Sequence, residues 1–124
     1  MRNRLVPRTE WYRFFRDFSR RHEDWLVTVR IVSPTLGAQV ESSDLPLEGI
    51  VADHAGHGPI SIHMGRTPEH HVEHEVPYPK QVWVELSADG AEEALEIESN
   101  DGTKTIVQFR SSPLPQEVDG LLHP

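Results

Sequence analysis

Large apolar side chains near the start of the chain recur with the period of an α-helix. One side of this stretch is aromatic, at positions i, i+3, i+4 and i+7: Trp11, Phe14, Phe15 and Phe18. The opposite side is charged, with Arg13, Arg16, Asp17 and Arg20. With Thr9 as N-cap and Glu10 in the first turn, the pattern predicts an amphipathic helix of about 12 to 15 residues. We expect its aromatic side to pack in the core, while docking on a membrane surface or a partner is the alternative.

From Trp25 onward the period changes to two residues, which is typical of β-strands. Alternation is clearest in residues 25–32, 60–64 and 81–86, and Asp101-Gly102 between two extended runs predicts a hairpin. Residues 38–42 and 45–52 predict two strands separated by a polar break. Pro46 confines the second of these to a sheet edge or a strand start, and Gly49 suggests a bulge or bend. The fold class we predict is α+β, with an N-terminal amphipathic helix followed by a curled antiparallel sheet or small barrel of about six strands.

The composition of the 124 residues narrows the class of protein. The length fits one domain, which we place at residues 1–111, followed by a loose, Pro-containing tail at 112–124. The absence of cysteine excludes disulfides, thiolate metal sites and a cysteine nucleophile. No apolar run is long enough to span a membrane, and the first residues lack the apolar stretch of a signal peptide, so we expect a cytoplasmic protein.

Charge is distributed unevenly along the chain, whose net charge is −8. Residues 1–30 contain eight arginines and four acids, whereas the remaining 94 residues contain four basic and sixteen acidic side chains. Phosphate would be repelled by this acidic body, so we expect no nucleic-acid partner. Complementary charge instead suggests association with a protein or with a second copy. The candidate contact residues are Arg13, Arg16, Arg20 and Trp83, the last on the strand face opposite Val82 and Val84.

Histidine is concentrated between residues 54 and 74, where six of the eight lie. Imidazoles with nearby carboxylates can bind zinc, nickel or copper, and the candidate ligands are His71, Glu73 and His74. On a strand, however, His71 and Glu73 share one face while His74 points to the other, so the two imidazoles cannot chelate one ion without a bulge. The alternative is that these are solvated loop histidines, with His74 partly buried.

The sequence carries none of the common catalytic motifs. It lacks a Gly-x-Ser-x-Gly elbow, a His-Glu-x-x-His helix, a phosphate-binding P-loop and a Gly-x-Gly-x-x-Gly turn. Carboxylate pairs such as Glu73 and Glu75 alternate with apolar residues, as solvent-facing strand positions do. We therefore expect a protein that is not an enzyme.

The chain resembles a family of small bacterial proteins known only as a domain of unknown function. The resemblance runs from about residue 5 to Gly120 and rests on these segments: Trp11 to Phe15, Phe18-Ser19-Arg20 with His22, Trp25 to Val29, Gly37 to Glu41, Leu45 to Ile50, His71 with His74, Ala94 to Ser99 with Asp101-Gly102, and Phe109-Arg110-Ser111. It implies no activity, cofactor or partner. His71 and His74 match the family pattern, whereas His54, His57 and His70 do not.

These observations predict a non-enzymatic module that binds a protein partner or itself through a sheet edge or the helix flank. The alternative is a metal-binding protein based on histidine and glutamate, with zinc or nickel held near His71, Glu73 and His74.

Overall fold

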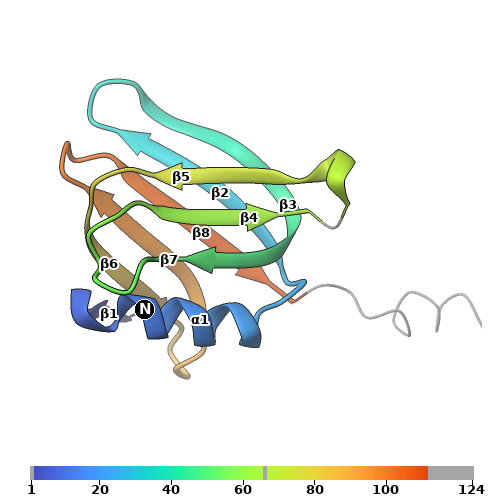
Figure 1. Ribbon diagram of the computed structural model, residues 1–124, viewed down its shortest axis with the longest axis horizontal. Helices are drawn as coiled ribbons and strands as arrows, with labels where there is room; N and C mark the ends of the chain where they lie inside the picture. Colours follow the sequence, from blue (N-terminus) through green and yellow to red (C-terminus); the bar gives the residue numbers. More distant parts are fainter. Residues whose placement is uncertain (1, 66, 112–124) are drawn as a thin grey trace, which may run out of the picture.

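The computed structural model describes residues 2–65 and 67–111, which form one helix, two short 3₁₀ turns and eight strands (Figure 1). The helix is α1 (Trp11–Arg21), and the 3₁₀ turns are η1 (Arg8–Glu10) and η2 (Pro68–His70). The strands are β1 (Arg2–Val6), β2 (Leu26–Ser33), β3 (Gly37–Val51), β4 (Ile60–Met64), β5 (Val72–Val76), β6 (Pro79–Leu86), β7 (Glu92–Ser99) and β8 (Lys104–Arg110). No helix in this part of the chain is long and apolar enough to cross a membrane.

The eight strands form one antiparallel sheet in the order β1-β6-β7-β8-β2-β3-β4-β5. The two end strands, β1 and β5, do not pair with each other, so the sheet is open. In Figure 1, β4 and β5 pass in front of β2 and β8, and α1 runs along one end of the sheet. The predicted α+β class and antiparallel sheet are confirmed, but the count of about six strands and the closed-barrel alternative are wrong.

The first element is a strand, not the predicted N-terminal helix. β1 pairs with β6, with Leu5 opposite Trp83, and Val6 is buried in the core. Two arginines in five residues leave too little apolar alternation to mark a strand, and the pairing partners are residues 82–86, far along the chain. β1 is therefore a strand because it pairs with residues far away in the chain, which local sequence patterns do not reveal.

Strand β3 belongs to both halves of the curled sheet. Its first part pairs with β2 as far as Pro46, and the part from Leu47 onward pairs with β4. We expected two strands separated by a polar break, and Pro46 at an edge or a strand start. Pro46 lies instead within one 15-residue strand, at the point where β3 changes its partner from β2 to β4. At this position its missing N–H does not break a continuous row of hydrogen bonds to either strand. The predicted irregularity at Gly49 is confirmed by a register shift between Leu47 and Gly49.

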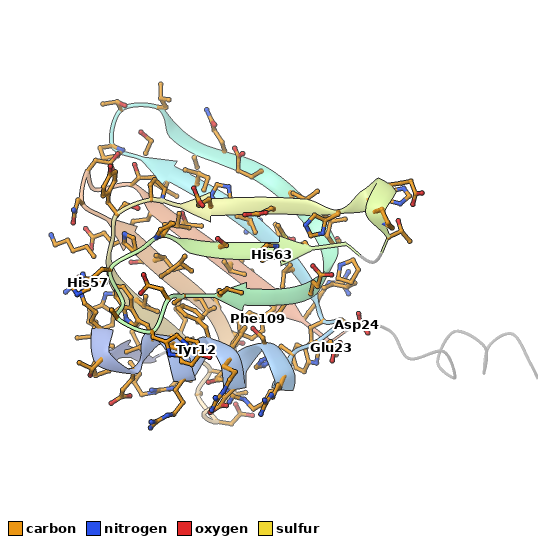
Figure 2. All side chains as sticks on the ribbon, viewed as in Figure 1. Tyr12, Glu23, Asp24, His57, His63 and Phe109 are labelled. Carbon is orange, nitrogen blue, oxygen red and sulfur yellow. The ribbon has the colours of Figure 1, made fainter. Side chains whose placement is uncertain are left out.

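Helix α1 begins at Trp11, and Thr9 lies in the preceding 3₁₀ turn instead of capping it. Its aromatic side is buried, as predicted: Trp11, Phe15 and Phe18 are inaccessible or nearly so. Phe109 lies between α1 and the sheet (Figure 2), and its ring meets Phe18 edge-on at a centroid distance of 4.9 Å. Ser19 Oγ accepts the backbone N–H of Ile50 at 2.8 Å, which fixes the helix to β3.

The core fills the concave side of the sheet with alternate residues from each strand. Val27 and Val29 of β2 stand opposite Phe109 and Val107 of β8. The predicted hairpin joins β7 to β8 through Asp101 and Gly102, whose φ of +88° suits glycine. The tail predicted at residues 112–124 lies outside the described residues.

Candidate metal centre

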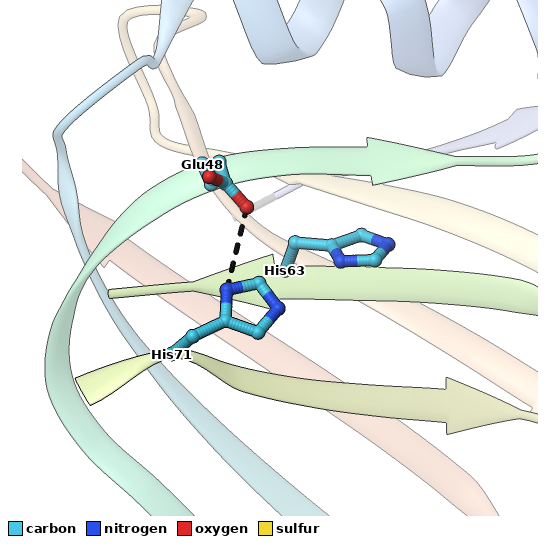
Figure 3. Close-up of side chains that lie close together, drawn as sticks. All are labelled: Glu48, His63 and His71. Atoms are coloured by element: carbon cyan, nitrogen blue, oxygen red, sulfur yellow. Dashed lines mark ion pairs between the residues drawn. The ribbon is translucent and has the colours of Figure 1, made fainter. Parts of the chain in front are cut away.

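Three strand segments bring two imidazoles and a carboxylate together on the outer face of β3, β4 and β5 (Figure 3). The residues are Glu48, His63 and His71, and one ligand atom from each lies within 4.8 Å of the other two. His63 is half-buried, while Glu48 and His71 are exposed. We call this set the Glu48 cluster.

A bulge in β3 places Glu48 beside His63. Leu47 pairs with Met64 and Gly49 with His63, so Glu48 is the additional residue between two successive pairs. Leu47 and Met64 are buried, whereas Glu48 is exposed and His63 lies on the outer side of β4. The bulge therefore adds a carboxylate to the face that already carries His63.

The turn between β4 and β5 positions His71. Gly65 adopts a φ of +100° and donates its N–H to the Pro46 carbonyl at 2.8 Å. A β-carbon on Gly65 would lie 2.0 Å from the carbonyl oxygen of His70, so this close approach requires glycine. The side chains of Thr67 and His70 hydrogen-bond at 2.9 Å within the same turn. These contacts hold the backbone that leads directly to His71.

The distances suit a small cation. His71 Nδ1 lies 3.5 Å from Glu48 Oε1, and the His63 and His71 ring centroids are 5.7 Å apart. Neighbouring ligands of a tetrahedral zinc ion, with metal–nitrogen distances of about 2.0 to 2.1 Å, are about 3.3 to 3.4 Å apart. An open depression of about 530 Å³ beside the cluster is lined by Glu48, Gly65, Thr67, Pro68 and His71. Solvent and ions therefore have direct access to the ligand atoms.

A second carboxylate lies next to this set. Glu73 Oε1 is 3.9 Å from His63 Nδ1, because Glu73 and His63 stand opposite each other on β5 and β4. A carboxylate beside one ring nitrogen of a ligand histidine orients the ring and fixes its tautomer, which leaves the other nitrogen for the metal. Glu73 can fill this orienting role or supply a further oxygen.

The three ligands predicted from the sequence separate in the structure. His71 is part of the Glu48 cluster, and Glu73 stands beside it on the same face, as the alternation predicts. His74 lies on the inner face of β5, opposite Ile62, and is half-buried. Burial lowers the pKa of His74, with the nearby Glu41 opposing this effect. The structure therefore keeps the two predicted imidazoles apart, as expected for a strand without a bulge.

Sequence reasoning did not select Glu48 or His63 as ligands. Outward-facing His63 and the bulge signalled by Gly49 were both visible in the sequence. What was missing was the register that places β3, β4 and β5 side by side, since Glu48 and His71 are far apart along the chain.

The other described histidines have local structural contacts or lie away from the cluster. His54 stacks on Tyr12 with ring centroids 3.8 Å apart, and His57 lies in the loop before β4, apart from His63 (Figure 2). His22 is buried, and its Nδ1 donates a hydrogen bond to the Phe18 carbonyl oxygen at 3.0 Å. Its pKa is lowered by burial.

The predicted partner-binding residues lie on two separate surfaces. Arg13, Arg16 and Arg20 are exposed on α1; Arg16 lies 3.7 Å from Asp17, and neither Arg13 nor Arg20 forms an ion pair within residues 2–65 and 67–111. Trp83 lies on the outer face of β6, as predicted, and is partly exposed beside Leu5 of β1. The two surfaces are therefore distinct candidates for association.

The fold and the cluster define a small, mostly β protein with a surface set of side chains that could hold a metal ion. The model of a family of unknown function (DUF5335) matches residues 2–118, and the chain belongs to this family, in agreement with the resemblance found in the sequence. The chain is similar to an uncharacterized protein of Aquifex aeolicus, with 27% identity over 117 residues that cover 94% of this chain and 100% of that relative. No solved structure matches the chain.

Proposed function

We propose that this protein is a non-enzymatic module that binds one divalent transition-metal ion, zinc or nickel, at the Glu48 cluster. The observation that supports this proposal is the convergence of three ligand atoms within 4.8 Å of one another. Two imidazole nitrogens and a carboxylate oxygen form a mixed nitrogen and oxygen set of the kind that suits zinc and nickel. Three protein ligands would leave a further coordination position for water or for a group from a partner.

The arrangement also supplies the support that such ligands need. Each ligand comes from a strand, or from the residue directly before one, so the sheet limits its movement. Glu73 stands beside His63, and Gly65 fixes the turn that ends at His71. The ligand atoms need only small side-chain rotations to close around an ion.

A zinc titration of the tag-free protein, followed by calorimetry or by competition with a coloured chelator, tests this proposal. We expect one ion per chain, and we expect His63→Ala with His71→Ala to abolish binding. His74→Ala and His57→Ala are matched controls because both remove an imidazole outside the cluster, and both should retain binding. Zinc uptake that is absent in the unaltered protein, or that survives loss of both cluster histidines, would contradict the proposal.

Self-association is the second candidate function, and a groove between α1 and β3 favours it. The groove has a volume of about 300 Å³; Ile50 and Ala52 contribute to its apolar lining, and Arg16 and Arg20 lie at it. Val51 beside them is 55% exposed. Glu48 and Glu73 lie on the outer side of β3 and β5, and Glu41 and Glu75 of the same two strands are exposed as well. The basic helix of one copy would meet this acidic face of another.

Sedimentation at low and high salt tests the second candidate. Ion pairs across exposed surfaces are screened within about 10 Å at 0.1 M salt, so we expect oligomers at low salt that dissociate as salt is added. Arg16→Glu with Arg20→Glu should give a monomer at every salt concentration, whereas Arg30→Glu on β2 is the matched control. A monomer at all salt concentrations in the unaltered protein would exclude this function.

A further inference from the structure

The concave side of the sheet contains a cavity of about 440 Å³ that the apolar core does not fill. One wall consists of β5 and the turn after it, with His74, Pro77 and Tyr78. The other wall carries Ile31 of β2, Thr105 of β8 and Ser99 at the end of β7. The cavity therefore lies between strands that do not pair with one another. Its volume is within the range of about 300 to 1,000 Å³ found for small-molecule sites.

Two hydroxyl groups occupy positions at which the core pattern calls for apolar side chains. Phe109, Val107 and Thr105 alternate along the inner face of β8, and Leu95, Ile97 and Ser99 do the same along β7. In the sheet, Thr105 of β8 pairs with Ile31 of β2 on one side and with Ile97 of β7 on the other. The inner face thus changes from apolar to polar where it reaches the cavity.

Neither hydroxyl has a partner in the described part of the chain. Thr105 is 2% exposed and Ser99 is 5% exposed, and their side chains form no hydrogen bond within residues 2–65 and 67–111. No side-chain nitrogen or oxygen in these residues is both fully enclosed and without a partner. The small accessible part of each residue must therefore include its hydroxyl, which opens into the cavity.

The opposite wall contributes an imidazole. His74 is half-buried, and its ring nitrogens form no hydrogen bond within the described ranges. The nitrogens of an imidazole ring can donate and accept hydrogen bonds. The cavity is thus faced from both sides by groups that can hydrogen-bond a ligand.

The charges at the cavity are acidic. Glu75 and Asp101 contribute to its lining, and none of the described lining residues is lysine or arginine. Ile31 and Pro77 provide apolar surface. An anionic ligand would lie near two acidic residues and no counter-charge from the described lining, whereas an uncharged ring could pack on the apolar surface and bond to the hydroxyls.

We propose that this cavity binds a small, uncharged, ring-shaped molecule that carries a hydroxyl or amide group, held by Thr105, Ser99 and His74. The site lies on the inner face of β5, whereas the Glu48 cluster lies on the outer face. It therefore does not depend on metal binding, and either proposal can fail without the other.

Nuclear magnetic resonance titration with benzyl alcohol tests the cavity, and benzoate is the matched anionic probe with the same ring. We expect saturable shifts at Ile31, Thr105 and Ser99 with benzyl alcohol, and binding of benzoate that is weaker by about tenfold or more because of Glu75 and Asp101. Benzyl alcohol that gives no saturable shift at these residues, or benzoate that binds equally well, would overturn the proposal.

Variants of the wall identify the groups that hold the probe. Thr105→Val keeps the branched shape and removes only the hydroxyl, so we expect the affinity for benzyl alcohol to fall about five- to tenfold. Ser61→Ala, on the outer side of β4, removes a hydroxyl elsewhere and should leave the affinity unchanged. Ser99→Ala provides an independent variant of the same wall and should also weaken binding. Unchanged affinity in both wall variants would overturn the assignment.

Discussion

The guanidinium group of Arg8 lies over the indole ring of Trp11, with its Cζ 4.4 Å from the ring centroid. The same group donates hydrogen bonds to the carbonyl of Gly56, in the loop before β4, and to the carbonyl of Pro79 at the start of β6, 3.2 Å away. Trp11 Nε1 in turn donates to the Val6 carbonyl at 2.9 Å. Arg8 thus connects segments from both halves of the open sheet.

Replacing Arg8 with methionine should therefore destabilise the fold. Arg8→Met keeps part of the apolar side chain but removes the cation over Trp11 and the hydrogen bonds to the carbonyls of Gly56, Pro79 and Lys80, so we expect the free energy of unfolding to fall by about 1 to 3 kcal/mol. Arg13→Met is the control, because Arg13 is exposed and forms no hydrogen bond or ion pair among the described residues; it should change stability by less than about 0.5 kcal/mol. Equal urea midpoints for the two variants would contradict this role of Arg8.

Two partly desolvated histidines should make stability depend on pH. Burial lowers the pKa of both His22 and His74 below 6.5, so the unfolded chain binds protons at these positions more readily than the folded protein. The free energy of unfolding is then highest above pH 6.5 and falls as the pH decreases from 6.5 through the lower folded-state values. Urea unfolding at about pH 7.5 and about pH 5 measures this change.

The contribution of His74 can be isolated from that of His22 by substitution. His74→Gln should reduce the difference in stability between the two pH values, because one of the two groups no longer titrates. His57→Gln removes an exposed imidazole and should leave the difference as it is. A pH difference that is identical in all three proteins would argue against His74 as a source.

Alanine at Gly65 should disturb both the fold and the Glu48 cluster. Its β-carbon would lie 2.0 Å from the His70 carbonyl oxygen, so the backbone before His71 has to move. We expect Gly65→Ala to lower the free energy of unfolding by about 3 kcal/mol or more, because the clash adds to the strain of the positive φ, and to weaken zinc binding. Gly37→Ala has a similar positive φ but no atom within 4 Å of the added carbon, so it should cost only about 1 to 2 kcal/mol and leave zinc binding intact.

Metal binding at the Glu48 cluster should stabilise the folded protein. An ion that binds only the native state at a free concentration of about 100 times its Kd raises the free energy of unfolding by about 2.7 kcal/mol. We expect zinc to raise the unfolding midpoint and a chelator to reverse the change. The protein with His63→Ala and His71→Ala should show neither effect, which separates this stabilisation from binding at other histidines.

The elements found correctly from the sequence are those set by local periodicity. The aromatic side of α1 and the Asp101-Gly102 hairpin depend on residues close together in the chain, and both are present in the structure. β1 was missed because its partner strand in the described part of the chain is the distant β6, and two arginines mask its alternation. The sequence predicts two strands in place of β3, because the polar stretch between them gives no local sign that a single strand continues from its pairing with β2 to its pairing with β4.

The candidate metal cluster follows the same rule. Alternation along β5 correctly placed His71 and Glu73 on one face and His74 on the other. Glu48 and His63 join them through strand pairing and the β3 bulge, and the pairing register was not available from a single sequence. The inner cavity also depends on this long-range arrangement, since Thr105 and His74 face it from strands that do not pair.

The pairing of β1 with β6 joins two strands that are far apart along the chain. β1 contains the first described residues, yet its hydrogen-bonding partners are residues 82–86. Closing so long a loop is slow compared with forming the β7–β8 hairpin, whose strands are adjacent in sequence. We therefore expect β1, which is made before its partner β6, to add late to a sheet whose centre can already be formed.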